Sequence, residues 1–170
     1  NWGGMTFIIH AAVVDNMNAL DFGIPSGGWF GLRTTKTLPN LFPDHDGNAD
    51  KRAMFQKNNL EIDDIGKSSE GYGITKFKNV TRSGAIAPNI GPDGNFVDVD
   101  VPVFRLAEMY LNYAEAVLRG GSGGDQATAI NYINLLRNRA YQGSSGNVSA
   151  INLDFILDER AREMYWEGLR

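Results

Sequence analysis

The chain has 170 residues, of which 42% are apolar and 21% charged, and its formal net charge is −4. This size and composition are typical of a soluble domain that buries a sizeable core. The small negative charge excludes a general attraction for nucleic acid or anionic lipid, and the absence of cysteine excludes thiol catalysis, disulfides and thiolate metal sites.

The first part of the chain, residues 1–102, is rich in Gly, Asn, Asp and Pro. We interpret it as loops with a few short strands or helices. "TFIIHAAVV" (Thr6 to Val14) is an apolar run that fits either a buried strand or a helix, because periodicity does not separate the two. "NFVDVDVPVF" alternates apolar residues with Asp98 and Asp100, which predicts a short half-buried strand. Pro102 then marks a boundary before the helices.

From residue 103 onward the pattern is helical. Residues 103–120 place apolar side chains at three- and four-residue steps, and two glycines end the helix. Asp125 is the expected N-cap of a second helix over residues 126–140, and the short connection favours an antiparallel pair. A third helix is expected to begin near Asn152 or Leu153 and to run to Arg170. The pair resembles one tetratricopeptide unit, and such a unit needs partner helices.

The ends of the chain indicate a piece of a larger protein. The start, "NWGGMTFIIH", lacks an initiator Met, a basic n-region and a cleavage site, so it is not an intact signal peptide. No apolar run is as long as the about 18 residues that are needed to span a bilayer. Any anchoring segment is therefore expected outside these residues.

The last helix concentrates carboxylates and guanidinium groups. At helical spacing Glu159 reaches Arg162, as does Asp158, and Glu167 reaches Arg170, so the sequence predicts ion pairs along the surface. Glycoside hydrolysis needs two facing carboxylates, one of them with a raised pKa. Glu159 and Glu163 share a face, but the neighbouring arginines favour the ionised form of both. Catalysis by this pair is therefore not expected.

No metal or cofactor site is expected. The two histidines, His10 and His45, do not form a metal-binding pair. The stretch from Asp44 to Asp50 alternates oxygen-bearing residues as calcium loops do, but no Glu follows at the twelfth position, which favours a solvated acidic turn and leaves calcium binding open. The chain has no nucleophile elbow, phosphate-binding loop or dinucleotide fingerprint.

Aromatic residues in glycine-rich loops are the candidate binding residues. "GIPSGGWFGLRTTK" places Trp29 and Phe30 among turns, with Arg33 close behind, and Trp2 opens the chain. Indole and phenyl faces stack on the apolar face of a sugar ring, and a guanidinium bonds its hydroxyls. The alternative is that Trp29 packs its loop onto the core.

Three blocks of the C-terminal part together resemble the SusD/RagB family. They are "VPVFRLAEMYLNYAEAVLR", "AINYINLLRNRA" and "ILDERAREMYWEGLR", in that order. Upstream, "DKRAMF" resembles the family's Asp-x-Arg turn, "ITKFKN" a short strand, and "GGWFGLRTTKTLPNLF" a segment of some members. The similarity spans residues 27–170 and is strongest after Val101.

The resemblance implies a mainly α fold. Tetratricopeptide-like antiparallel helix pairs would form a scaffold, here residues 103–170, for a loop-rich part with a few short strands that holds the ligand, here residues 1–102. The chain would then be a fragment of one larger SusD-like domain. Family members are not enzymes, and they bind oligosaccharides, or in some cases peptides, at the bacterial outer membrane. They act as lids on TonB-dependent transporters of the SusC type and are anchored by a lipidated N-terminal Cys.

The family's helical motif residues are scaffold positions rather than ligand positions. They are Arg105, Glu108, Asn112, Glu115, Arg137, Arg139, Glu159, Arg160 and Glu163. The binding residues Trp29, Arg33, Trp2 and Phe30 rest on their chemistry alone. Two alternatives stay open: a tetratricopeptide scaffold that binds protein segments, and a glycoside hydrolase. The sequence does not identify the glycan.

Overall fold

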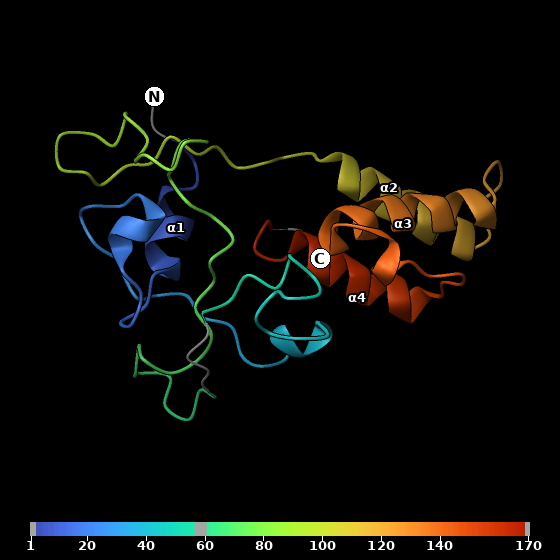
Figure 1. Ribbon diagram of the computed structural model, residues 1–170, viewed down its shortest axis with the longest axis horizontal. Coiled ribbons are helices and arrows are strands. Elements are labelled where there is room, and N and C mark those ends of the chain that lie inside the picture. Colours follow the sequence, from blue (N-terminus) through green and yellow to red (C-terminus); the bar gives the residue numbers. More distant parts are fainter. Residues whose placement is uncertain (1–2, 57–60, 169–170) are drawn as a thin grey trace. The chain divides into compact units, whose positions relative to one another are not determined.

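The computed structural model describes residues 3–56 and 61–168. The chain divides into two compact units (Figure 1). The first unit comprises Asn1–Asn40 and Met54–Val101, and the second comprises Leu41–Ala53 and Pro102–Arg170. Each unit is described by itself below.

The second unit is built on three α-helices, α2 (Leu106–Leu118), α3 (Gln126–Tyr141) and α4 (Leu153–Met164), with a 3-10 turn η3 (Ser144–Gly146) before α4. Both α3 and α4 pack against α2 (Figure 1). The predicted N-cap Asp125 is confirmed, because its carboxylate accepts the Thr128 N–H at 2.8 Å, and Asn152 caps α4 by accepting the Phe155 N–H at 2.8 Å. The mainly helical fold expected from the sequence is also confirmed.

The helices enclose one apolar core. Small side chains at the centre of α2 and α3, Ala114 and Ala129, are fully buried and let the two helices approach closely. The other buried members of this core are Ala107, Leu111, Ile133, Leu136, Ile151, Ile156 and Met164. The core thus uses only part of the apolar pattern of α2, because Leu111 and Ala114 are buried while Leu106 and Met109 are exposed.

The third helix is shorter than expected. We predicted a helix to Arg170, but α4 ends at Met164, and Tyr165 leaves it with an extended ψ of 141°. This turn lets the Tyr165 hydroxyl donate to the Arg52 carbonyl at 2.7 Å, while its ring meets Phe42 edge-on at 6.3 Å. Tertiary bonds thus replace the last helical turn. The expected pair of Glu167 with Arg170 lies partly outside the described residues, and within them Glu167 binds Arg105 at 2.6 Å.

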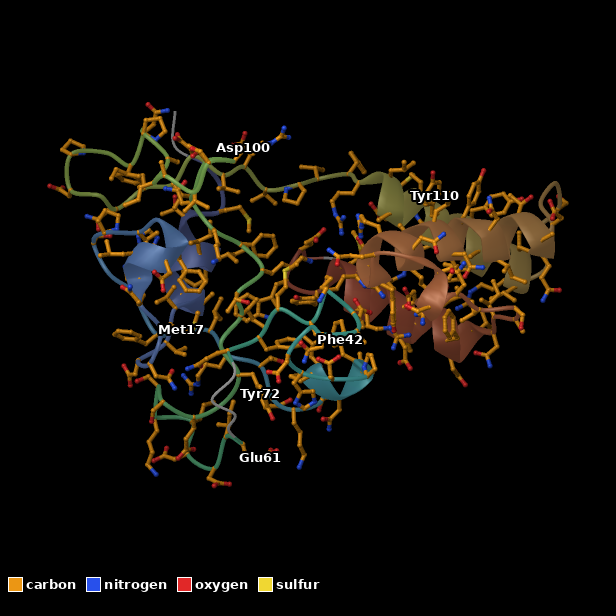
Figure 2. All side chains as sticks on the ribbon, in the orientation of Figure 1. Met17, Phe42, Glu61, Tyr72, Asp100 and Tyr110 are labelled. Carbon is orange, nitrogen blue, oxygen red and sulfur yellow. The ribbon has the colours of Figure 1, made fainter. Side chains whose placement is uncertain are left out.

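Segment 41–53 packs with the helices rather than with the loops that flank it in sequence. The Lys51 N–H donates to the carbonyl of Ala140 at the end of α3, and Arg162 of α4 donates to the Leu41 carbonyl at 2.8 Å. Figure 2 labels Phe42 in this segment. The helical unit therefore includes a stretch that the sequence does not mark as helical.

The first unit contains the short helix α1 (Thr6–Ala12) and the 3-10 turn η1 (Ala19–Phe22), and η2 (Pro39–Leu41) lies at its boundary. The open question about Thr6 to Val14 is thus resolved in favour of a helix over Thr6–Ala12, and Ile9 in this helix and Val13 just after it both enter a small core. The other buried members of this core are Met5, Phe22, Ile24 and Val97. The rest of the described unit consists of loops and turns around α1 (Figure 1).

The predicted short strands are reduced to isolated bridges. In the described residues antiparallel bridges join Thr34 to Tyr72, Phe55 to Ile74 and Val80 to Ile86. The expected strand over residues 96–103 is wrong. The carbonyls of Val97 and Val99 do accept backbone bonds, from Gly3 and Met5, but these do not extend into a ladder. The backbone N–H of Asp98 is not available for a strand ladder, because it donates to the Asn79 side chain at 2.9 Å.

No helix in the described part of the chain combines the length and the apolar character needed to cross a membrane.

Candidate functional site

The loop that carries Trp29 is fixed to the end of α1 by backbone hydrogen bonds. The last carbonyls of a helix have no partner within the helix and must be satisfied from outside. Here the Trp29 N–H donates to the His10 carbonyl at 2.8 Å, and Leu32 donates to Ala11 at 2.8 Å. The Phe30 N–H donates to Val13, just beyond the helix, at 3.2 Å. Backbone hydrogen bonds therefore hold segment 29–32 in a fixed position against the end of α1.

Two backbone features make this close approach possible. A Cβ atom at Gly28 would lie 2.5 Å from the Val13 carbonyl oxygen, so only glycine fits there. Phe30 has a φ of +56°, a left-handed conformation that is uncommon for a bulky residue and costs about 1–2 kcal/mol. Such strain is found at functional sites, where the surroundings enforce it.

The Trp29 indole lies on a buried support. Its ring is stacked on the His10 imidazole at 4.5 Å with an interplanar angle of 28°. His10 is fully buried, with Nδ1 2.9 Å from the Thr6 carbonyl and Nε2 3.2 Å from the Ser26 hydroxyl. The indole nevertheless remains 47% exposed. Trp29 is thus held in place while part of its surface stays open to solvent.

A second aromatic ring stands beside it. Phe7, on α1, is 59% exposed, and its ring lies 6.2 Å from that of Trp29 at an angle of 54°. We call Phe7 and Trp29 the aromatic patch. Sequence reasoning missed Phe7 because the strand or helix assignment of its segment was open. Once the segment is helical, Phe7 and His10 are three residues apart on one face. Phe30, the next residue along the loop, is also exposed.

Arg33 braces the loops of the unit. Its Nη1 donates to the Phe30 carbonyl at 3.3 Å and its Nη2 to the Ile65 carbonyl at 2.9 Å. Its Nε is buried and has no hydrogen-bond partner among the described residues. The guanidinium is therefore already in use, and a direct bond from Arg33 to a ligand stays a prediction. Trp2, the fourth predicted residue, lies outside the described residues.

The charged cluster of α4 is buried rather than spread along the surface as predicted. Glu159 is fully buried and accepts hydrogen bonds from three arginines. Arg52 and Arg137 each approach it at 2.7 Å, and Arg162, three residues along the helix, at 3.0 Å. Arg52 also binds Asp50 at 2.7 Å, which joins segment 41–53 to the helices. The expected pair of Glu159 with Arg162 is confirmed, but most of the network is tertiary.

Glu163 is the centre of a second group of arginines. Arg139 approaches it at 2.6 Å, Arg105 at 3.0 Å and Arg52 at 3.3 Å. Burial alone would raise the pKa of Glu163, but the bond from Arg139 and the charges of Arg52 and Arg105 outweigh it and lower this pKa. A general acid needs the opposite shift. The scaffold role implied for these residues is therefore supported by the geometry.

We expect the helical unit to lose stability in acid. Arg52 holds the pKa of Asp50 below its ordinary value against the effect of burial, and the pKa of Glu163 is lowered too. A carboxylate with a lowered pKa stabilises the fold above its unfolded pKa of about 4, and this contribution is lost as the pH falls through the folded pKa. Urea unfolding at pH 7, 5, 4 and 3 should show the decline below about pH 4. The loss of unfolding free energy between about pH 5 and pH 3 should be smaller in Glu163→Gln than in the unchanged protein. Equal losses in the two proteins would contradict a stabilising role of the Glu163 carboxylate.

The acidic turn is organised by Asp44. Its carboxylate accepts the backbone N–H groups of Asp46, Asn48 and Ala49 at 2.9–3.0 Å, which lowers its pKa. Asp50, at the end of the same stretch, is bound to Arg52. In the described part of the chain no three His, Asp or Glu side chains are grouped closely enough to hold a metal ion.

Comparison with known proteins assigns the family. A sequence model described as the SusD family matches residues 45–170 of the chain. The chain belongs to the SusD family. The match includes the three helices and segment 45–53, and so the whole buried arginine–carboxylate network. The aromatic patch lies before residue 45 and outside the match.

One relative within the SusD family is informative. The chain is 37% identical over 111 residues to a protein of Bacteroides thetaiotaomicron named starch-binding protein SusD. The alignment covers 65% of this chain but spans only 18% of the relative's length. The shared part is therefore a minor portion of a SusD protein.

Proposed function

We propose that this SusD-family chain is part of a non-catalytic protein that binds oligosaccharides or polysaccharide at the bacterial cell surface. The observation that carries the proposal is the Trp29 indole, which is stacked on buried His10 yet half exposed beside the exposed ring of Phe7. Sugar rings bury their apolar C–H faces against such aromatic surfaces. The name of the starch-binding relative supports this ligand class.

The aromatic patch suits a ligand with repeated sugar rings. Two exposed rings whose centres lie 6.2 Å apart offer two adjacent stacking surfaces. Because the indole is supported from beneath and its backbone is fixed to α1, little side-chain freedom is lost when a ligand binds. We infer that Phe30, Arg33 and Trp2 complete the site, with Arg33 acting through the loops that it braces.

Within the same proposal, the protein is a lipid-anchored component of the outer membrane that delivers glycan to a SusC-like TonB-dependent transporter. This part rests on the family assignment. The hydrolase alternative is disfavoured because the two carboxylates considered for it, Glu159 and Glu163, are surrounded by arginines. Release of reducing sugar from starch or another glycan by the purified protein would contradict a purely binding role.

The test is affinity electrophoresis of the full-length protein in gels that contain starch or other polysaccharides. We expect Trp29→Ala to weaken binding by at least about tenfold, because truncating an aromatic anchor in a binding site costs about 2 kcal/mol or more. Phe7→Ala should weaken it to a smaller extent, since its ring lacks the buried support. The matched control is Phe104→Ala, which removes a ring that is 82% exposed in the helical unit. Retardation that survives the loss of both Trp29 and Phe7 would exclude this site.

A further inference from the structure

The imidazole of His10 lies between Trp29 and a chain of hydrogen bonds, and both of its nitrogens face oxygen atoms. Its Nδ1 is 2.9 Å from the Thr6 carbonyl oxygen, and its Nε2 is 3.2 Å from the Ser26 hydroxyl oxygen. The Ser26 hydroxyl in turn donates to the carbonyl of Gly94 at 2.8 Å. These three contacts join α1 to the loop that carries Trp29 and to the loop that carries Gly94.

The number of protons on His10 follows from the partners of its two nitrogens. A carbonyl oxygen only accepts hydrogen bonds, so the contact of Nδ1 with Thr6 needs a proton on the ring. A serine hydroxyl has one proton, and Ser26 uses it on Gly94, so its oxygen is an acceptor towards Nε2. A neutral imidazole carries a proton on one nitrogen, whereas the imidazolium carries one on each. All three contacts are therefore satisfied together only when His10 is charged.

The surroundings of His10 compensate for the burial of this charge. The side chain is fully buried, and a buried charge is costly unless hydrogen bonds and opposite partial charges surround it. The face of the Trp29 indole, 4.5 Å away, carries a negative partial charge that attracts cations. His10 also lies in the last turn of α1, where the carbonyl dipoles favour a positive charge. Two acceptor oxygens, an aromatic face and a helix end thus favour the imidazolium.

The protonation of His10 does not depend on an ion pair in the described part of the chain. The segments that supply its contacts are 6–14, 24–32 and 91–98. Apart from His10 itself, the charged or titratable side chains in these segments are Asp93 and Asp98. Asp93 is exposed, and the carboxylate of Asp98 accepts a backbone N–H at 3.0 Å. Among the described residues, neither carboxylate forms an ion pair or a hydrogen bond with His10.

The loss of one proton from His10 would break this chain of hydrogen bonds. Imidazole is the side chain that ordinarily changes its charge within the physiological pH range. In the neutral ring, either the bond to Thr6 is lost or Ser26 must turn its proton from Gly94 to Nε2. The attraction between the ring and the indole also weakens, because it depends on the positive charge. Both changes weaken the support that holds Trp29 in place.

We propose that His10 is a positioning residue whose positive charge makes glycan binding at Trp29 sensitive to pH. This inference rests on the glycan site proposed above. The protonated form holds the indole against α1, so a sugar ring meets a fixed surface. The neutral form leaves the indole with more freedom, which a ligand must restrict at a cost in affinity. Glycan affinity should therefore fall as the pH rises.

The first measurement is the intrinsic fluorescence of the full-length protein without glycan, between about pH 5.5 and pH 8.5. An imidazolium quenches a neighbouring indole more strongly than the neutral ring does, so emission should rise with pH. The rise should disappear in Trp29→Phe and in His10→Gln, and it should remain in His45→Gln, which changes the other histidine of this chain. Ser26→Ala removes an acceptor of the imidazolium and should shift the rise to lower pH, whereas Ser26→Thr keeps the hydroxyl and should not.

The second measurement is affinity electrophoresis at both ends of this pH range, each compared with a gel without polysaccharide. We expect glycan affinity to be about threefold to tenfold higher at the lower pH, and His10→Gln to bind about equally at both. Fluorescence that does not change with pH, or an equal pH dependence of binding in His10→Gln and the unchanged protein, would overturn the proposal. A protein that binds no glycan at any pH, but whose fluorescence still depends on His10, would contradict the glycan site itself and with it this regulation.

Discussion

Replacing Glu159 by Ala is expected to lower the free energy of unfolding of the helical unit by about 3–5 kcal/mol, because removing one member of a buried ionic network leaves its partners unpaired. Glu159 is the shared acceptor of Arg52, Arg137 and Arg162 and has no exposed surface. Without it, three guanidinium groups would repel one another in a region of restricted solvation. The measurement is urea unfolding followed by circular dichroism at 222 nm, which reports mainly on α2, α3 and α4.

The adjacent residue provides the control for this prediction. Asp158 is exposed on the same helix, so Asp158→Ala should change stability by no more than about 0.5 kcal/mol. Glu159→Gln keeps the shape of the side chain but removes its charge, and we expect it to lie between the two. Equal unfolding midpoints for Glu159→Ala and Asp158→Ala would show that the buried network does not stabilise the fold.

Replacing Gly28 by Ala is expected to reduce glycan binding about as much as Trp29→Ala, although the substitution leaves every aromatic ring in place. The added Cβ would lie 2.5 Å from the Val13 carbonyl oxygen, so segment 29–32 must move away from the end of α1. This displaces the Trp29 indole from its support on His10. Overpacking of this kind also costs about 1–3 kcal/mol of stability. Affinity electrophoresis and thermal unfolding measure the two effects.

Gly31→Ala is the matched change in the same loop. Its Cβ would meet only the Ala11 side chain, at an ordinary contact distance of 3.7 Å, and the Trp29 carbonyl oxygen at 4.0 Å. We therefore expect near-normal binding and stability. If both variants bound glycan normally, the attachment of this loop to α1 would not be needed for the site.

The structure shows ion-pair partners for the charged cluster of α4 that helical spacing alone does not predict. At helical spacing, Glu159 has a partner in Arg162, and this local pair is present. Arg52 and Arg137 are 107 and 22 residues away, and only folding brings them to the same carboxylate. The network accordingly joins segment 41–53 to α3 and α4, and this explains why a loop-like stretch belongs to the helical unit.

The sequence by itself determined the features that depend on neighbouring residues. The three helices and the N-cap Asp125 follow from periodicity and local hydrogen bonding. The SusD-family assignment likewise follows from local blocks. Trp29 was singled out from the chemistry of its indole alone, and its role in binding stays a prediction.

Only the tertiary structure decided the features that depend on distant partners. The helix α1 and the loose pairing around Val97 result from a small shared core, which no local pattern specifies. The early end of α4 results from the bond of Tyr165 to Arg52 and of Glu167 to Arg105. The positions of Phe7 beside Trp29 and of Arg33 against the Ile65 carbonyl could not be predicted either, because loop positions are set by hydrogen bonds to remote carbonyls. Such bonds depend on chain geometry rather than on residue type, and a sequence pattern therefore does not reveal them.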